Sequence, residues 1–135
     1  MSKNQYEIPE GLYYSKDHEW MKSEGNKVKV GITDYAQDSL NDVVYVELPE
    51  MEKTVKQFDA MGAVESVKAA SDIFSPVSGK IVEVNKRLEQ EPELVNKEPY
   101  GDGWIVLIET SSLQEDLTKL MDAAKYAAYL KDLGK

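Results

Sequence analysis

The chain has 135 residues, with 25 acidic residues against 16 basic ones, a net charge of −9, and 41% hydrophobic residues. This length suits one compact domain, residues 1–135, that is large enough for a core. The acidic balance argues against binding to nucleic acid or to an anionic membrane surface. The chain has no cysteine and one histidine, His18. Disulfides, thiolate nucleophiles and cysteine-ligated zinc or iron–sulfur clusters are therefore excluded, and we expect no metal site.

The chain also lacks the sequence features of a membrane protein. Its apolar runs fall short of the roughly 18 residues that a membrane-spanning helix needs. Residues 1–10 lack the apolar stretch of a secretory signal. We therefore expect a cytoplasmic monomer. Its own side chains offer little catalytic equipment.

Short alternating apolar segments between turn residues predict a mostly β fold. Residues 1–11 are polar and are expected to form a loose lead-in. Strands are predicted, in chain order, at residues 12–15, 18–22, 27–32, 43–48, near 55, 60–67, 73–77, 80–85 and 104–109. The last of these is apolar on both faces and is expected to be central in its sheet. Residues 69–72 are expected to form the turn between two strands.

Helical signals are fewer. Thr33 is a suitable N-cap for a short helix over residues 34–40, and one helical turn is expected at Leu94 and Val95. Residues 112–133 form a C-terminal helical segment, in which Ser112 to Glu115 has the pattern of a capping box. Asp122 is a second possible cap, so one helix or two are compatible with the sequence. Short strands with a helical tail predict a β-sandwich or flattened barrel.

Lys68 stands out because it lies near the expected tip of a hairpin, among small residues such as Ala69 and Ala70. Small neighbours leave the ammonium group open to a modifying enzyme. Amide formation there would remove the charge and turn the side chain into a long flexible tether. A solvated turn lysine looks the same in a sequence, so composition alone leaves both interpretations open.

The segment around Lys68, VESVKAASDIFSPVSG at 64–79, resembles the lipoylation hairpin of the H-protein family of the glycine cleavage system. The resemblance continues in order and covers roughly residues 12–130. The other matching segments are DHEW at 17–20, VGITDYAQ at 30–37, DVVYVELP at 42–49, PELVN at 92–96 and PYGDGW at 99–104. Ordered segments of this kind are far more specific than one short motif.

The resemblance implies a non-catalytic carrier with that family's fold, a mostly β lipoyl/biotinyl-type barrel-sandwich hybrid with a short internal helix and one or more C-terminal helices. By position, Lys68 would carry lipoate in amide linkage. The lipoyl arm would take the aminomethyl group of glycine from a pyridoxal-phosphate-dependent glycine decarboxylase to the tetrahydrofolate-dependent aminomethyltransferase. Dihydrolipoamide dehydrogenase would reoxidise it. A lipoate ligase, or an octanoyl or lipoyl transferase, would install it.

The residues beside Lys68 form the context of the hairpin. Glu65 and Ser66 are equally compatible with docking of the lipoylating enzyme and with solvated positions. Val67 and Ala69 flank the lysine, whereas biotin carriers typically place methionine on both sides, so biotin is disfavoured.

Two other functions remain open. Some proteins of this kind relay an octanoyl or lipoyl group to other carriers, and their hairpin would look the same. The second alternative is a structural β domain in which Lys68 is unmodified. Genes for glycine decarboxylase near the gene of this chain would favour the cleavage system over the relay.

The remaining polar and aromatic residues favour structural roles. His18 is expected to be a structural histidine on a strand, and Trp20 and Trp104 are expected in the core. Gly101 to Gly103 are expected to form a turn that allows positive φ. The acidic side chains expected on the solvated surface are Glu89, Glu91, Glu93 and Asp116.

Three residues depart from the family pattern. Asn41, Glu52 and Phe58 stand where glycine is usual. Asparagine is the next best residue for left-handed backbone, so the turn at Asn41 is expected to persist. The conformation of residues 50–60 is left open.

Overall fold

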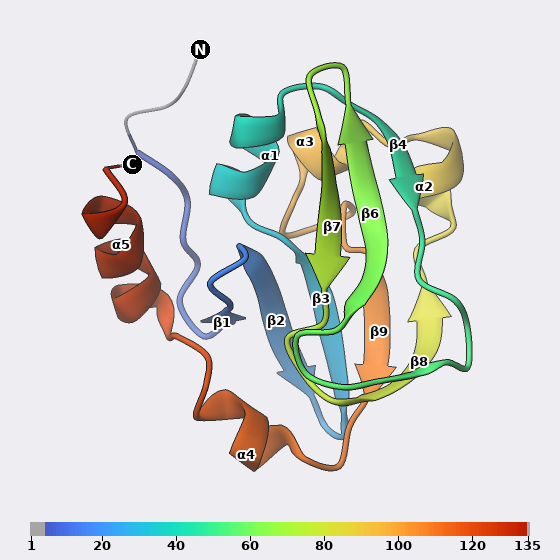
Figure 1. Ribbon diagram of the computed structural model, residues 1–135, viewed down its shortest axis with the longest axis vertical. Helices are drawn as coiled ribbons and strands as arrows, with labels where there is room; N and C mark the ends of the chain where they lie inside the picture. The colour runs from blue at the N-terminus through green and yellow to red at the C-terminus, as the bar shows by residue number, and fades with distance from the viewer. Residues whose placement is uncertain (1–4, 135) are drawn as a thin grey trace.

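The computed structural model describes residues 5–134, so positions 1–4 of the predicted lead-in and position 135 lie outside the described residues. Within these residues the strands form two antiparallel sheets (Figure 1). The large sheet has the order β1 (Tyr13–Tyr14), β2 (Glu19–Glu24), β3 (Lys27–Ile32), β9 (Val106–Glu109), β8 (Gly79–Val84) and β5 (Thr54–Val55). The small sheet has the order β4 (Val43–Glu47), β6 (Ala60–Ser66) and β7 (Ala70–Phe74). The mostly β prediction is confirmed.

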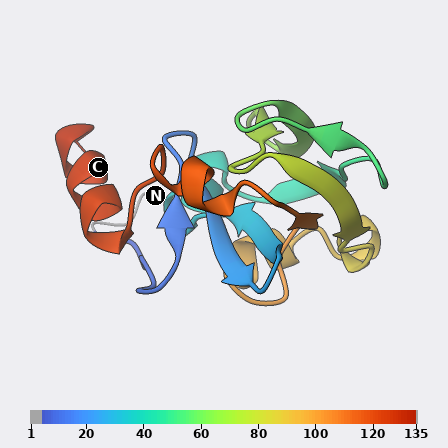
Figure 2. The same ribbon diagram turned by 90° about the horizontal axis from the view of Figure 1, so that it is seen from below.

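The two sheets lie face to face, with the green strands of the small sheet above the blue strands of the large one in Figure 2. Alternation along each strand sends one set of side chains between the sheets. Val30 and Ile108 from the large sheet, and Val46, Val64 and Ile73 from the small one, are all buried in this core. Strand β9 is central, as predicted from its apolar character on both faces.

Short helices lie around the two sheets (Figure 1). They are α1 (Asp34–Leu40), α2 (Arg87–Gln90), α3 (Leu94–Lys97), α4 (Leu113–Leu117) and α5 (Ala123–Asp132). The Thr33 side chain caps α1 by accepting from the backbone N–H of Ala36, as predicted. Asp122 caps α5, so the C-terminal segment contains two helices. The predicted capping box at Ser112 is wrong, because its hydroxyl donates to the carboxylate of Asp116 and accepts from no N–H of α4.

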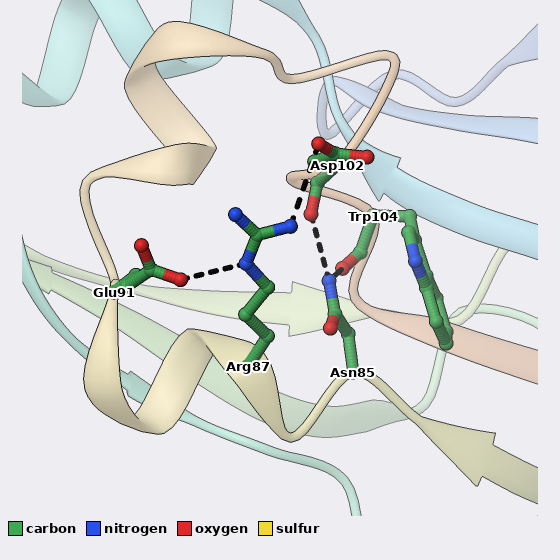
Figure 3. A network of polar contacts seen from close by, with 5 residues as sticks. All are labelled: Asn85, Arg87, Glu91, Asp102 and Trp104. Carbon is green, nitrogen blue, oxygen red and sulfur yellow. Dashed lines mark hydrogen bonds and ion pairs between the residues drawn. The ribbon is translucent and has the colours of Figure 1, made fainter.

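The segment between β8 and β9 is held by polar contacts among its own residues (Figure 3). The Asn85 amide donates to the carbonyls of Asp102 and Trp104, each at 2.8 Å. Arg87 pairs with Glu91 at 2.6 Å and with Asp102 at 3.5 Å. The turn predicted at residues 101–103 is confirmed, although its glycines do not use the positive φ that glycine allows. Gly103 is instead a site of close backbone approach, since a Cβ there would lie 2.5 Å from the carbonyl oxygen of residue 94.

A second group of buried side chains, called here the aromatic cluster, lies between the start of the large sheet and α5. Tyr14, Trp20 and Tyr126 are its fully buried aromatic members, with Ala123 and Leu130 beside them. The rings of Tyr14 and Tyr126 stack at a centroid distance of 4.6 Å. The cluster therefore anchors α5, which Figure 1 shows beside the sheets rather than over them.

Residues 5–11 of the predicted lead-in form no strand or helix but are bonded to the rest of the chain. The backbone N–H of Glu7 donates to Asp34 at 2.9 Å, and the Tyr100 hydroxyl donates to the Glu7 carbonyl at 2.8 Å. No helix in residues 5–134 is long and apolar enough to span a bilayer.

Candidate functional site: the Lys68 hairpin and its cavity

The hairpin of β6 and β7 turns earlier than the sequence predicts. Residues 69–72 were expected to turn, but Ala70–Asp72 already belong to β7 and the turn spans Ser66 to Ala69. The cause is Ser66, whose hydroxyl accepts from the backbone N–H groups of Lys68 and Ala69 at 3.2 and 3.0 Å. A side-chain acceptor of this kind stabilises a tight turn without glycine.

Lys68 lies at the tip of this turn, which Figure 1 shows above α1. Its side chain is exposed, and its Nζ donates to the carbonyl of Ser39 at 3.1 Å, in the last turn of α1. A cation is favoured there by the helix dipole. Of the residues predicted as hairpin context, Glu65, Val67 and Ala69 are exposed and Ser66 is partly covered by its bonds. The structure thus brings all five together at one exposed end.

The tip is braced by neighbouring segments. The backbone N–H of Val67 donates to the carbonyl of Asp42 at 3.1 Å. Asn96, from α3, accepts from the N–H of Val43 and donates to the carbonyl of Asn41, both at 2.8 Å. Sequence reasoning quoted Asn96 only as part of a matching segment. The bracing fixes the backbone of the tip, while the lysine side chain stays exposed and makes one hydrogen bond, to the Ser39 carbonyl.

A cavity of about 150 Å³ opens between α1 and β7, beside the hairpin. Three of its lining side chains are acidic: Asp17, Glu19 and Asp72. The rest of its wall is formed by His18, Ile32, Tyr35, Ala36, Ser39, Leu40, Val64, Ser71 and Ile73. Ser39, the carbonyl partner of Lys68, lines the cavity as well. The lysine therefore lies at its rim, next to a space with apolar walls and acidic groups.

Glu19 is the buried carboxyl group of this site, with 1% of its surface exposed. It accepts hydrogen bonds from the Ser15 hydroxyl and, at 3.1 Å, from the backbone N–H of Phe74. Burial disfavours the charged form and raises the pKa of Glu19 to about 7, although these two bonds oppose the shift. Glu19 joins the large sheet to the small one and titrates near neutral pH. In the sequence, Glu19 was noted only as part of the matching segment DHEW, and nothing there indicated that it is buried.

His18 was expected on a strand but lies just before β2, with a φ of 71°. Its Nδ1 lies 2.8 Å from the Tyr126 hydroxyl, which is also 2.8 Å from the Thr33 hydroxyl. Burial raises the pKa of Tyr126, so its hydroxyl stays protonated. His18 thus links the wall of the cavity to the aromatic cluster, which supports its predicted structural role.

The three departures from the family pattern all adopt positive φ: 65° at Asn41, 70° at Glu52 and 72° at Phe58. At these positions the backbone has the conformation that favours glycine, so each side chain adds backbone strain. Asn41 has a ψ of −150°, outside the left-handed helical region expected for it.

The remaining predictions have mixed outcomes. Trp20 is buried as predicted, and its indole N–H donates to the Pro99 carbonyl at 2.8 Å. Trp104 is only half-buried, with Lys29 Nζ 5.4 Å from its ring centre. The prediction that Asp116 is solvated is wrong, because it is buried and accepts from the N–H of Ser78 at 2.8 Å. Among residues 5–134, no cluster of three or more acidic, histidine or cysteine side chains is placed to hold a metal.

Comparison with known proteins gives one consistent result. A family model described as glycine cleavage H-protein matches residues 12–133. A protein named probable glycine cleavage system H protein, from Pyrococcus horikoshii, is 54% identical over 130 residues, 96% of each chain. The glycine cleavage system H protein of Thermus thermophilus is 54% identical over 125 residues, 93% of this chain and 97% of its own.

A solved structure gives the same result for the fold. The crystal structure of a glycine cleavage system H protein from Mycobacterium marinum matches with a TM-score of 0.84 and 36% identity. The match covers 92% of this chain and 99% of that one. It confirms the predicted barrel-sandwich fold. The range matched by the family model includes the Lys68 hairpin and every segment that lines the cavity.

Proposed function

Because the chain belongs to the glycine cleavage H-protein family, the lipoyl carriers of the glycine cleavage system, we propose that Lys68 is the residue to which lipoate is attached. The observation that carries this assignment is the position of Lys68 at the exposed tip of a braced hairpin. The protein would contribute no catalytic side chain of its own.

The surroundings of Lys68 fit an acylated lysine. Its Nζ makes one hydrogen bond, to an exposed backbone carbonyl at Ser39, and no ion pair with a described residue. An amide nitrogen keeps one N–H and can still donate to that carbonyl. Loss of the charge would leave no buried partner unpaired, so acylation costs the fold little.

A lipoyl group held by Lys68 would supply a dithiolane able to accept and release the aminomethyl group of glycine. The cavity beside the hairpin offers a resting place for the end of the arm. Cavities of about 150 Å³ hold a molecule the size of benzene, which is comparable to a dithiolane ring. Its apolar walls suit that ring, while Asp17, Glu19 and Asp72 would attract a protonated amine. A cation next to Glu19 would lower the pKa of that carboxyl group and favour its charged form.

The partners follow from the same assignment. The arm would visit the pyridoxal-phosphate-dependent decarboxylase, the tetrahydrofolate-dependent aminomethyltransferase and dihydrolipoamide dehydrogenase. Tethering raises the local concentration of the carried group at each enzyme. The net charge of −9 favours partner faces that are basic.

The test is intact-mass measurement, with fragment mapping, of the protein co-expressed with a lipoate ligase. One lipoyl-sized addition at Lys68, absent from Lys68→Arg, is expected. An unmodified Lys68 in the presence of a competent ligase would overturn the assignment. Incubation of the lipoylated protein with glycine and the decarboxylase then separates the cleavage system from a lipoyl relay, since only the former loads the arm.

A further inference from the structure

The outer face of the small sheet, at the end that carries Lys68, is uncovered. Its outward side chains lie in two rows across the strands: Tyr45, Glu65 and Ala70 in one, and Glu47, Ala63 and Asp72 in the other. The row between them faces the core through Val46 and Val64. Figure 2 shows no helix or strand over the green strands of this sheet.

A β-bulge in β4 enlarges the apolar part of this face. Val43 is opposite Ser66 and Tyr45 is opposite Glu65, so Val44 is the extra residue. A bulge turns two successive side chains outward where a regular strand would turn one inward. Val44 and Tyr45 are accordingly both 53% exposed.

Val67 adds a third apolar side chain at the same end, and it is 72% exposed. Its N–H bond to the Asp42 carbonyl places it beside the start of β4. Val44, Tyr45 and Val67 are called here the apex patch. Of the six large hydrophobic side chains exposed among the described residues, these three lie at this one end. Exposed apolar side chains gathered in this way mark an interaction surface.

Apart from Lys68 itself, the charged side chains on the strands around the apex patch are all acidic. Strands β4, β6 and β7, which the structure describes in full, contain the carboxylates of Glu47, Glu65 and Asp72 and no basic residue. Asp42 adds a further exposed carboxylate between α1 and β4. A partner that fits this surface has an apolar centre and a basic rim.

We propose that the apex patch and its acidic rim form the docking surface for the enzyme that acylates Lys68. The inference rests on the proposed function and adds the surface by which the modifying enzyme recognises this chain. Enzymes that act on the far end of the lipoyl arm are reached by the arm itself. The acylating enzyme must instead bring Lys68 Nζ into its own active site, so the residues that flank the tip must contact that enzyme.

The chemistry sets this requirement. The ammonium of Lys68 loses a proton, and Nζ then attacks the carbonyl carbon of an activated acyl donor, a lipoyl-adenylate made from lipoate and ATP. A carbon–nitrogen bond forms, the bond from that carbon to the phosphate oxygen breaks, AMP leaves with the electron pair, and nitrogen loses a second proton. The attack requires Nζ and the carbonyl carbon to be in contact. The surface on either side of the turn must therefore fit against the enzyme.

The test compares three unmodified proteins. They are the wild type, a double variant that combines Val44→Ser with Tyr45→Ser, and the single variant Val67→Ser. A lipoate ligase supplied with lipoate and ATP is the probe. Initial rates are read as intact mass over a range of carrier concentrations, and binding of the unmodified carrier to the ligase is measured by calorimetry. We expect KM and Kd to rise about tenfold or more, the size of an interface anchor.

Two controls isolate the effect. Leu133→Ser removes an apolar side chain of similar exposure, 45%, at the C-cap of α5, outside the small sheet, and is expected to stay within about twofold of wild type. Val44→Thr and Val67→Thr keep the shape and strand preference of valine, so they test the patch if a serine variant unfolds. Reduction of an arm already attached, by dihydrolipoamide dehydrogenase, is expected to change by less than about twofold in every variant.

The outcomes separate the two proposals. Failure of the ligase to modify wild-type Lys68 would overturn the proposed function and this inference together. Normal modification of wild type with unchanged KM and Kd in the patch variants would overturn the docking surface alone. An equal loss in Leu133→Ser would do the same. Glu47→Lys gives an independent readout, because reversal of a rim charge should weaken ligase binding and reduce its dependence on salt.

Discussion

The Lys68 hairpin and the aromatic cluster differ in how their residues are used. At the hairpin tip, small or exposed side chains surround a lysine, and the backbone is held by Ser66 and by neighbouring carbonyls. In the aromatic cluster, Tyr14, Trp20 and Tyr126 are fully buried and their polar atoms are bonded. This division suits the proposed attachment of lipoate at Lys68, because the tip could then be modified without disturbing the side chains that stabilise the fold.

The strongest test of this comparison removes Trp20. Trp20→Ala should lower the free energy of unfolding by about 3–5 kcal/mol, because a buried indole leaves a cavity and the Pro99 carbonyl loses its donor. Denaturant unfolding measures the loss. Half-buried Trp104 is the matched control, and its alanine variant should lose less. A loss below about 1 kcal/mol at Trp20 would show that the cluster is not where stability resides.

Glu19 lies between the two regions and gives the next largest effect. Its pKa is raised to about 7 from an ordinary 4.5, so the folded state binds more protons than the unfolded state between these values. Stability from this group is therefore present at low pH and is lost as pH rises through 7. Glu19→Gln should remove that dependence. We expect the stability of wild type relative to Glu19→Gln to fall by about 2 kcal/mol between pH 5 and pH 8.

Thermal or denaturant unfolding at the two pH values provides the measurement for Glu19. Glu65→Gln, at an exposed carboxyl on the hairpin, is the control for the substitution itself. If stability changed with pH in the same way in wild type and in Glu19→Gln, the Glu19 carboxyl group would titrate near its ordinary pKa. The link between the sheets would then be a plain hydrogen bond.

The sequence predicted most of the strands along the chain, the capped α1, the central β9 and the lysine hairpin, because alternation and turn residues are local signals. It misplaced the turn by a few residues, because the hydroxyl of Ser66 replaces the glycine that turns usually require. It also placed Asp116 in solvent. The partner that buries Asp116 is the N–H of Ser78, 38 residues away, and no periodicity reveals such a contact. The cavity was missed for the same reason, since α1, β2 and β7 meet there only in the folded chain.

Phe58 tests whether the connection between β5 and β6 stores strain. Its φ of 72° suits glycine, and its ring is 41% exposed. Alanine removes the ring but keeps the Cβ, while glycine removes both. Phe58→Gly should therefore be more stable than Phe58→Ala by about 1 kcal/mol. Denaturant unfolding compares the two variants. Equal stability would mean that the backbone relaxes around a Cβ, and the turn would then carry no stored strain.

The smallest expected effect on stability belongs to Lys68, the residue proposed to carry lipoate. Lys68→Arg should change the free energy of unfolding by less than about 0.5 kcal/mol, because the side chain is exposed and its single bond goes to an exposed carbonyl. Ser66→Ala, two residues away, should cost about 1 kcal/mol, since two N–H groups of the turn lose their acceptor. Unfolding curves for both variants measure the contrast. If Lys68→Arg cost as much as Ser66→Ala, the lysine itself would brace the turn. Acylation would then loosen the hairpin, and the tip could not be modified independently of the fold.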